Sequence, residues 1–155
     1  MKVSVVTVGK VRSPFADAVL EFERRASRYW KIEIVTVARE SARSGNHDKL
    51  KDAEAARILN RIPSHFEIVA LTRGGKGMDS LALAGLLNQH AIDASPGLAF
   101  VIGGAFGLGE AVLSRARSHL SLSDMTLPHE LARLFLAEQL YRAGTILRGE
   151  PYHKG

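Results

Sequence analysis

The stretch LAFVIGGAFGLG, residues 98–109, predicts a buried β-strand that runs directly into a glycine-rich turn. Its first five residues are continuously apolar, and four of the next seven are glycine. A helical pattern then follows from Glu110 to His119. Strand, tight turn and helix in this order are typical of one unit of an α/β fold.

The same alternation extends in both directions from this stretch. We expect strands at 3–8, 32–37, 66–72, 98–102 and 120–122, and helices from Ser13 and Pro14 to Trp30, then at 48–61, 79–91, 110–119 and 129–147. Strands that alternate with helices favour a parallel sheet covered on both faces. The sequence therefore predicts an α/β fold with a doubly wound, mostly parallel sheet.

Length and composition predict one soluble domain that spans residues 1–155. The chain is 46% hydrophobic, which is enough for one compact core and too little for two. No apolar run is long enough for a membrane helix, and the N-terminus lacks the features of a secretory signal, so we expect a cytoplasmic protein. The absence of cysteine excludes disulfides, zinc thiolate sites and a cysteine nucleophile.

The net charge of +5 fits a polyanionic partner without demonstrating one. Residues 1–80 hold 15 Lys and Arg against 10 Asp and Glu, whereas residues 81–155 hold six of each. All the excess positive charge therefore lies in the first half. A merely soluble basic surface is the alternative interpretation.

Three unusual loops follow the last predicted strands. They are LTRGGKG (71–77), IGGAFGLG (102–109) and LSDMTLPH (122–129). In an open parallel sheet, ligands bind at the carboxyl ends of the strands. These loops therefore lie where a ligand should bind.

The glycine loop matches neither common phosphate-binding template. Its order is G-G-x-x-G-x-G, whereas the dinucleotide fingerprint requires G-x-G-x-x-G. The Gly75-Lys76 pair lacks the spacing of a P-loop. A ligand that approaches backbone amides closely would explain the glycines, but so would a tight turn between strand and helix.

The loop LSDMTLPHE, 122–130, carries more polar groups than a helix start needs. Ser, Asp and Thr close local hydrogen bonds in irregular turns, and Pro128 restricts Leu127 to an extended conformation. Such a loop could present backbone groups to an adenine edge between apolar side chains. Alternatively, Ser123 or Asp124 caps a turn and Pro128 starts the helix.

The final helix is apolar nearly all round, which favours burial against its own sheet and against a second subunit. We therefore expect a homodimer. Glu138 and Arg142 are four residues apart and suited to pair, although Arg142 could instead face a phosphate. Tyr152 and His153 lie in a tail that would ordinarily be frayed, yet they suit stacking on a nucleobase and proton transfer. The six histidines show no metal-ligand spacing, so we propose no metal site.

Taken in order, the loops resemble those of the RlmH family, the ribosomal large-subunit pseudouridine N3-methyltransferases of the SPOUT superfamily. The resemblance rests on LTRGGK, FVIGGAFGLGE, LSLSDMTLPHELARLFLAEQLYRA and the terminal PYHKG, and it extends over nearly the whole chain. It implies a deep trefoil knot in the C-terminal part, with S-adenosylmethionine held bent in the knot by backbone groups. The cofactor positions it implies are Leu71, Gly103, Leu122, Ser123, Asp124, Met125, Thr126 and Leu127.

The resemblance also implies a substrate, a pseudouridine of 23S rRNA within the assembled ribosome. Tyr152 and His153 would then seat and deprotonate the base, as catalytic residues. The expected RNA-binding residues are His129, Arg142, Arg24, Arg25, Arg28 and Lys76. Two departures from the family pattern, Thr72 for aspartate and Ala105-Phe106 for Pro-Glu, put side-chain contacts there in doubt.

Two other functions remain open. A SPOUT enzyme with another substrate, such as tRNA, would share the pocket and differ in its substrate surface. A nucleotide-binding or ribosome-assembly module would bind the same ligands without turnover.

Overall fold

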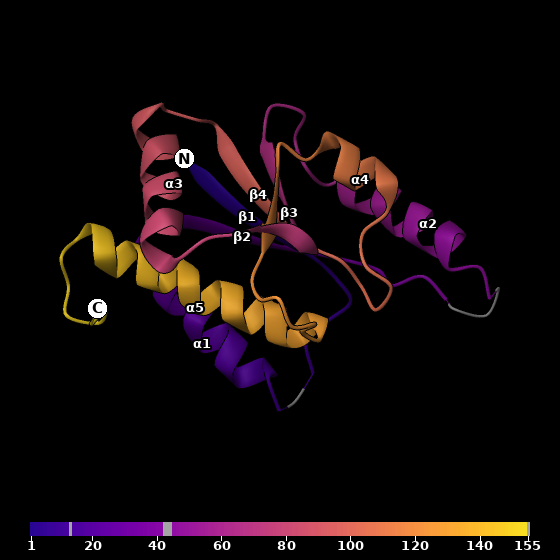
Figure 1. Ribbon diagram of the computed structural model, residues 1–155, viewed down its shortest axis with the longest axis horizontal. Helices are drawn as coiled ribbons and strands as arrows, with labels where there is room; N and C mark the ends of the chain where they lie inside the picture. Colours follow the sequence, from indigo (N-terminus) through magenta and orange to yellow (C-terminus); the bar gives the residue numbers. More distant parts are fainter. Residues whose placement is uncertain (13, 42–44, 155) are drawn as a thin grey trace.

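The computed structural model describes residues 1–12, 14–41 and 45–154, and its centre is a five-stranded parallel sheet (Figure 1). The strand order is β2-β1-β4-β3-β5, and every neighbouring pair is parallel. The strands are β1 (Lys2–Val8), β2 (Lys31–Val37), β3 (Glu67–Gly77), β4 (Gly97–Ile102) and β5 (Ser118–Ser121). The predicted parallel sheet is confirmed.

Helices cover both faces of this sheet, as a doubly wound fold requires (Figure 1). One face carries α1 (Ala16–Ala26), α3 (Ser80–Ile92) and α5 (His129–Leu147), with α5 packed against the other two. The opposite face carries α2 (His47–Leu59) and α4 (Glu110–Arg115), which pack on each other. Within the described part of the chain, no helix is long and apolar enough to cross a membrane.

The central strands are apolar on both sides because both sides are covered. All six residues of β4 are buried. In β1, Val3 and Val5 belong to the core under α3 and α5, whereas Val6 and Val8 belong to the core under α2. Two-sided burial explains why these strands are continuous hydrophobic runs without alternation.

The structure corrects two predicted boundaries near the carboxyl edge. β3 continues to Gly77, where we expected a turn after residue 72, and its register against β5 shifts so that Leu120 pairs with both Leu71 and Lys76. A Cβ on Gly75 would lie 2.7 Å from the backbone of His119, so only glycine allows the two strands to approach this closely. α4 ends at Arg115 instead of residue 119, because 118–121 forms β5.

The first helix is shorter than predicted. Its described span begins at Ala16 and ends at Ala26, and the predicted start at Ser13 lies outside the described residues. Trp30, which we expected to end the helix, donates from Nε1 to the backbone oxygen of Leu140 at 2.8 Å. Residues 27–30 therefore leave the helix and join α1 to the middle of α5.

Candidate functional site

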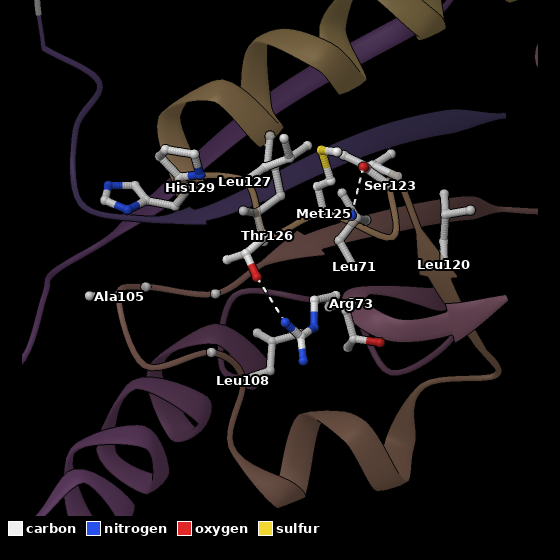
Figure 2. Close-up of a pocket in the computed structure, with 18 residues that line it drawn as sticks. Leu71, Arg73, Ala105, Leu108, Leu120, Ser123, Met125, Thr126, Leu127 and His129 are labelled. Carbon is white, nitrogen blue, oxygen red and sulfur yellow. Dashed lines mark hydrogen bonds between the residues drawn. The ribbon is translucent and has the colours of Figure 1, made fainter. Parts of the chain in front are cut away.

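The three predicted segments meet at one edge of the sheet and enclose a cavity of about 620 Å³ (Figure 2). Two are loops that follow β4 and β5, as predicted, whereas the first contributes residues 71–73 from within β3. This volume is in the range of small-molecule sites. Its lining residues are Leu71, Thr72, Arg73, Ile102, Gly103, Gly104, Ala105, Gly107, Leu108, Leu120, Leu122, Ser123, Met125, Thr126, Leu127, Pro128, His129 and Ala132. Apolar walls with a few polar groups suit a small ligand that combines a flat ring with polar groups.

The glycine loop is folded tightly on itself. Gly104 and Gly107 form an isolated bridge, and the Gly107 N–H donates to the Gly104 oxygen at 3.1 Å. Gly107 has a φ of +86°, which side chains disfavour, and a Cβ on Gly103 would lie 2.7 Å from the carbonyl carbon of Gly107. The glycines thus form a tight turn, and that turn is also a wall of the cavity.

The loop after β5 uses its hydroxyls to hold its own shape. The Ser121 hydroxyl donates to the Ser123 oxygen at 2.9 Å, and the Ser123 Oγ accepts from the Met125 N–H at 3.0 Å. Arg73 Nη1 donates to Thr126 Oγ1 at 3.1 Å, which joins this loop to the middle of β3 (Figure 2). α5 starts after Pro128 with no side-chain cap, so the extra polar groups shape the cavity wall.

A buried carboxyl lies behind the glycine loop. Glu54 of α2 is 3% exposed, and its two carboxyl oxygens are 3.2 and 3.3 Å from the position of a Cβ on Gly104. Burial raises the pKa of Glu54, against the lowering effects of the Glu40 backbone N–H, Arg39 and Arg57. At the N-terminal end of the same helix, His47 stacks on Phe106 with ring centres 3.8 Å apart. α2 therefore supports the cavity wall from outside.

This buried carboxyl makes stability depend on pH. Because its pKa is raised on folding, the unfolded chain ionises first as pH rises above the ordinary value of 4.5, and the free energy of unfolding falls until the folded form ionises too. Glu54→Gln removes this loss, so the stability of the variant relative to the parent should rise with pH above that value. Urea unfolding from pH 4 to 8 measures it, with Asp52→Asn on the exposed face of α2 as the control. A stability difference that does not vary with pH would contradict it.

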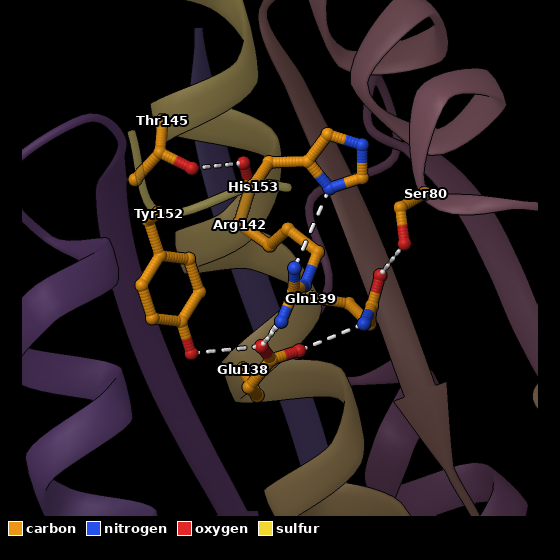
Figure 3. Close-up of polar contacts among 7 residues, drawn as sticks. All are labelled: Ser80, Glu138, Gln139, Arg142, Thr145, Tyr152 and His153. Atoms are coloured by element: carbon orange, nitrogen blue, oxygen red, sulfur yellow. Dashed lines mark hydrogen bonds and ion pairs between the residues drawn. The ribbon is translucent and has the colours of Figure 1, made fainter. Parts of the chain in front are cut away.

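A second polar cluster lies at the other end of α5 (Figure 3). Glu138 Oε1 accepts from Arg142 Nη2 at 2.6 Å and from the Tyr152 hydroxyl at 3.0 Å, which confirms the predicted Glu138–Arg142 pair. Arg142 Nη1 lies 3.4 Å from His153 Nδ1. Burial, and then the Glu138 hydrogen bond, raise the pKa of Tyr152 and keep its hydroxyl protonated.

The C-terminal tail is packed against its own chain. Tyr152 contacts Tyr141 at 4.6 Å between ring centres, and the Tyr29 hydroxyl donates to the Glu150 carboxylate. Gly144 makes room for Tyr29, since a Cβ there would lie 2.2 Å from the ring. Aromatic contacts and hydrogen bonds thus order residues that the sequence position alone marks as frayed.

The structure brings the predicted cofactor residues together and leaves the predicted catalytic residues apart from them. All of the former except Asp124 line the cavity, and so does His129. Tyr152, His153 and Arg142 lie at the opposite end of α5 (Figures 1 and 3). From His129 to Arg142, 13 residues of helix span about 20 Å. One copy of the chain therefore does not place its own tail at its own cavity.

The predicted RNA-binding arginines lie near the tail. Arg24 and Arg25 both pair with Glu21, and Arg25 also lies over the Tyr141 ring at 5.8 Å from its centre. Arg28 is exposed at the end of α1, and Lys76 is exposed on β3 beside β5. Pairing with Glu21 leaves Arg24 and Arg25 less available to phosphates than the sequence suggested.

Sequence reasoning missed several cavity residues and the contact between Glu138 and the tail. Arg73 and Leu108 line the cavity, and Glu138 joins Arg142 to Tyr152. A cation directly after a strand end could have indicated Arg73. Among the residues that the structure describes, no three His, Asp or Glu side chains gather to hold a metal ion.

Comparisons with known proteins agree with this geometry. Residues 1–153 match the family model described as a predicted SPOUT methyltransferase. A Gemmatimonas aurantiaca protein named ribosomal RNA large subunit methyltransferase H is 46% identical over 155 residues, with 99% of this chain and all of that protein covered. A Listeria monocytogenes protein of the same name is 43% identical over 99% of this chain and all of its own length.

A solved structure supports the fold. The crystal structure of a probable methyltransferase from Bordetella pertussis superimposes with a TM-score of 0.57, covering 92% of this chain and 94% of that one. Its sequence is 20% identical, so the likeness concerns the arrangement of strands and helices alone.

Proposed function

Because the chain belongs to the SPOUT methyltransferase family, in the group of the ribosomal RNA large subunit methyltransferases H, we propose that it transfers a methyl group from S-adenosylmethionine to N3 of a pseudouridine in 23S rRNA. We further propose that it acts on the assembled ribosome. The observation that carries the proposal is the cavity formed by residues 71–73 of β3 and the loops that follow β4 and β5. Both the cavity and the tail lie in parts of the chain that the family match covers.

The cavity fits S-adenosylmethionine in size and chemistry. Leu71, Ile102 and Leu122 offer apolar surface for an adenine ring. Gly103 and Gly107 have no side chains, so a ligand can reach the backbone amides of the turn. The predicted cofactor contacts that line the cavity are Leu71, Gly103, Leu122, Ser123, Met125, Thr126 and Leu127.

We also propose that the C-terminal part of the chain forms the deep trefoil knot of the SPOUT fold. The excursion of β3 between Leu71 and Lys76, both of which pair with Leu120, supports this topology. So does the contact of Arg73 with Thr126, which holds the loop after β5 against the middle of β3.

S-adenosylmethionine supplies the electrophilic methyl group when it is bound. The chain must hold the acceptor nitrogen in line with that methyl, and such positioning contributes roughly 7–11 kcal/mol to lowering a barrier. The loop held by Ser123 and by the Arg73–Thr126 hydrogen bond gives the cavity a fixed shape. Tyr152 and His153 provide the aromatic and imidazole groups that contact the base.

The separation of cavity and tail supports a homodimer with a shared site. Because Arg142, which contacts both Tyr152 and His153, lies 13 helical residues or about 20 Å from His129 at the cavity, Tyr152 and His153 of the partner subunit would complete the site. Exposed apolar side chains on or near α5, Phe135 at 38% and Met125 at 79%, are available to such an interface. In this arrangement each site uses the loops of one copy and the tail of the other.

The basic residues at the ends of α1 and α5 are the proposed RNA contacts. Arg28 is exposed, Arg25 lies over the Tyr141 ring that contacts Tyr152, and Arg24 is its neighbour in the last turn of α1. All three would contact the phosphates beside the target base. Lys76 and His129 lie near the cavity side, and Arg142 lies within the tail cluster. Phosphate contacts and RNA shape then replace a separate RNA-binding domain.

Methyl incorporation from labelled S-adenosylmethionine tests the function. The substrates are ribosomes that lack this modification, naked 23S rRNA and bulk tRNA, with mass spectrometry to locate the product. We expect label on N3 of one pseudouridine, in assembled ribosomes only. Label on tRNA would show that the substrate is tRNA instead of rRNA. Binding of the cofactor without methylation of any RNA would show that the protein is a binding module and no enzyme.

A further inference from the structure

The contact between Arg142 and His153 fixes the proton of the histidine ring. Arg142 Nη1 lies 3.4 Å from His153 Nδ1 (Figure 3). A guanidinium carries five N–H donors and no acceptor, so Nδ1 must accept with its lone pair. A neutral imidazole has a single N–H, which this contact places on Nε2.

Arg142 is held firmly in the position that makes this contact. Its Nε and Nη2 donate to Glu138 Oε1 at 3.0 and 2.6 Å. The Glu138 hydrogen bond raises the pKa of Arg142, so the guanidinium stays a donor. Its charged group also lies over the Tyr152 ring, 4.8 Å from the centre. Three charged or titratable groups, Glu138, Arg142 and Tyr152, contact one another beside His153.

Glu138 is itself fixed from two sides. Oε2 accepts from Gln139 Nε2 at 2.7 Å, and Gln139 accepts from the Ser80 hydroxyl of α3 at 2.6 Å. The chain of contacts therefore runs from α3 through α5 to the tail. It sets the orientation of the His153 ring before any substrate arrives.

The other ring nitrogen has nothing to bond within the described chain. His153 Nε2 is a buried atom without a hydrogen-bond partner among the described residues. A buried N–H without an acceptor is costly, and a substrate acceptor that reached Nε2 through a small shift of the tail on binding would remove that cost. Nε2 is thus suited to donate, while Nδ1, the nitrogen that could take up a proton, is engaged by Arg142.

We propose that His153 serves the methyl transfer as a hydrogen-bond donor through Nε2 to a carbonyl oxygen of the pseudouridine imide, and that it is not the base. This inference rests on the proposed function. The N3 proton passes to water, and the lone pair of N3 then forms the N–C bond while the C–S bond breaks and its electrons stay on sulfur. The negative charge left by the proton spreads onto the two carbonyl oxygens beside N3. A donor at one of these oxygens stabilises that charge.

Two substitutions at His153 distinguish a hydrogen-bond donor from a base. Glutamine at 153 offers an N–H near the position of Nε2 and cannot act as a base, whereas alanine offers neither. We expect His153→Gln to keep the single-turnover rate within about tenfold of the parent, and His153→Ala to lose about 100-fold or more. Rates are measured at saturating ribosomes and S-adenosylmethionine, with His65→Gln in the exposed turn before β3 as the control. Equal losses in the two variants would overturn the proposal.

The pH dependence gives a second readout that does not rely on the variant rates alone. If His153 donates, the parent and His153→Gln should show the same pH dependence, set by ionisation of the imide. If His153 is the base, the parent rate should show an additional ionisation step that the glutamine variant lacks. That second pattern overturns the inference while it leaves the proposed function intact. If the parent protein methylated no RNA at all, the proposed function itself would be overturned.

Discussion

Replacing Gly103 with alanine is expected to weaken S-adenosylmethionine binding by roughly 10- to 100-fold. A Cβ at this position would lie 2.7 Å from the carbonyl carbon of Gly107 and 3.0 Å from the backbone nitrogen of Leu108. These are backbone atoms, which cannot rotate away, so the turn must open. Overpacking of this kind costs about 1–3 kcal/mol, and the opened turn would narrow or distort the cavity that Gly103 lines.

Isothermal titration with S-adenosylmethionine measures this effect, and thermal unfolding shows whether the fold survives. Gly85→Ala is the matched control, because Gly85 lies on the exposed face of α3 with no atom within 4 Å of its added Cβ. That variant should bind the cofactor normally and gain about 0.5–1 kcal/mol of stability. An unchanged dissociation constant for Gly103→Ala would show that the cofactor binds elsewhere.

Arg133→Ala should lower the free energy of unfolding by about 3–5 kcal/mol. Arg133 of α5 donates to both carboxylate oxygens of Glu23 on α1, at 2.7 and 3.1 Å. The two side chains are only 9% and 10% exposed. Removal of the cation leaves a buried carboxylate without its partner, and that uncompensated charge is what destabilises the fold.

Urea unfolding near neutral pH measures this loss, and further variants identify its cause. Glu23→Ala should cost a similar amount, while the double variant Arg133→Met with Glu23→Leu should recover much of the stability because it leaves no buried charge. The exposed pair of Arg24 and Glu21 is the control, and Arg24→Ala should cost less than about 1 kcal/mol. A small effect of Arg133→Ala would mean that water reaches the pair.

Much of the fold could be predicted because it depends on local patterns. The apolar runs of β1 and β4 and the turn residues between elements predict a parallel sheet covered on both faces. α5 begins at His129 and ends at Leu147, as predicted. Pro128 favours the start because proline is disfavoured inside a helix, and Gly149, with a φ of +65°, favours the end. Loops that follow parallel strands converge at one edge, so the cavity could be predicted too.

The rest depends on contacts between distant segments, which leave no periodic pattern. The shift of β3 against β5 arises where Gly75 lets two backbones approach. The order of the tail comes from Tyr29, which is far from it in sequence, and from Tyr141 and Glu138 of α5. The carboxyl of Glu54 behind the glycine loop likewise appears only once α2 is docked on the sheet.

The shared site can be tested by combining two differently impaired subunits in one dimer, at an S-adenosylmethionine concentration that saturates the parent cavity but not the Gly103→Ala cavity. Subunits with Gly103→Ala carry an impaired cavity and an intact tail, and subunits with His153→Ala carry an intact cavity and an impaired tail. If each site combines the cavity of one copy with the tail of the other, the mixed dimer contains one intact site. If each chain uses its own tail, it contains none.

The measurement is methyl incorporation into ribosomes that lack the modification, by mixed dimers purified through two different affinity tags. Dimers of each single variant serve as the impaired references, and the parent dimer sets the full rate. The predicted result is about half the parent rate per dimer, well above both references. A mixed dimer no more active than the two references would contradict a site built from the cavity of one subunit and the tail of another.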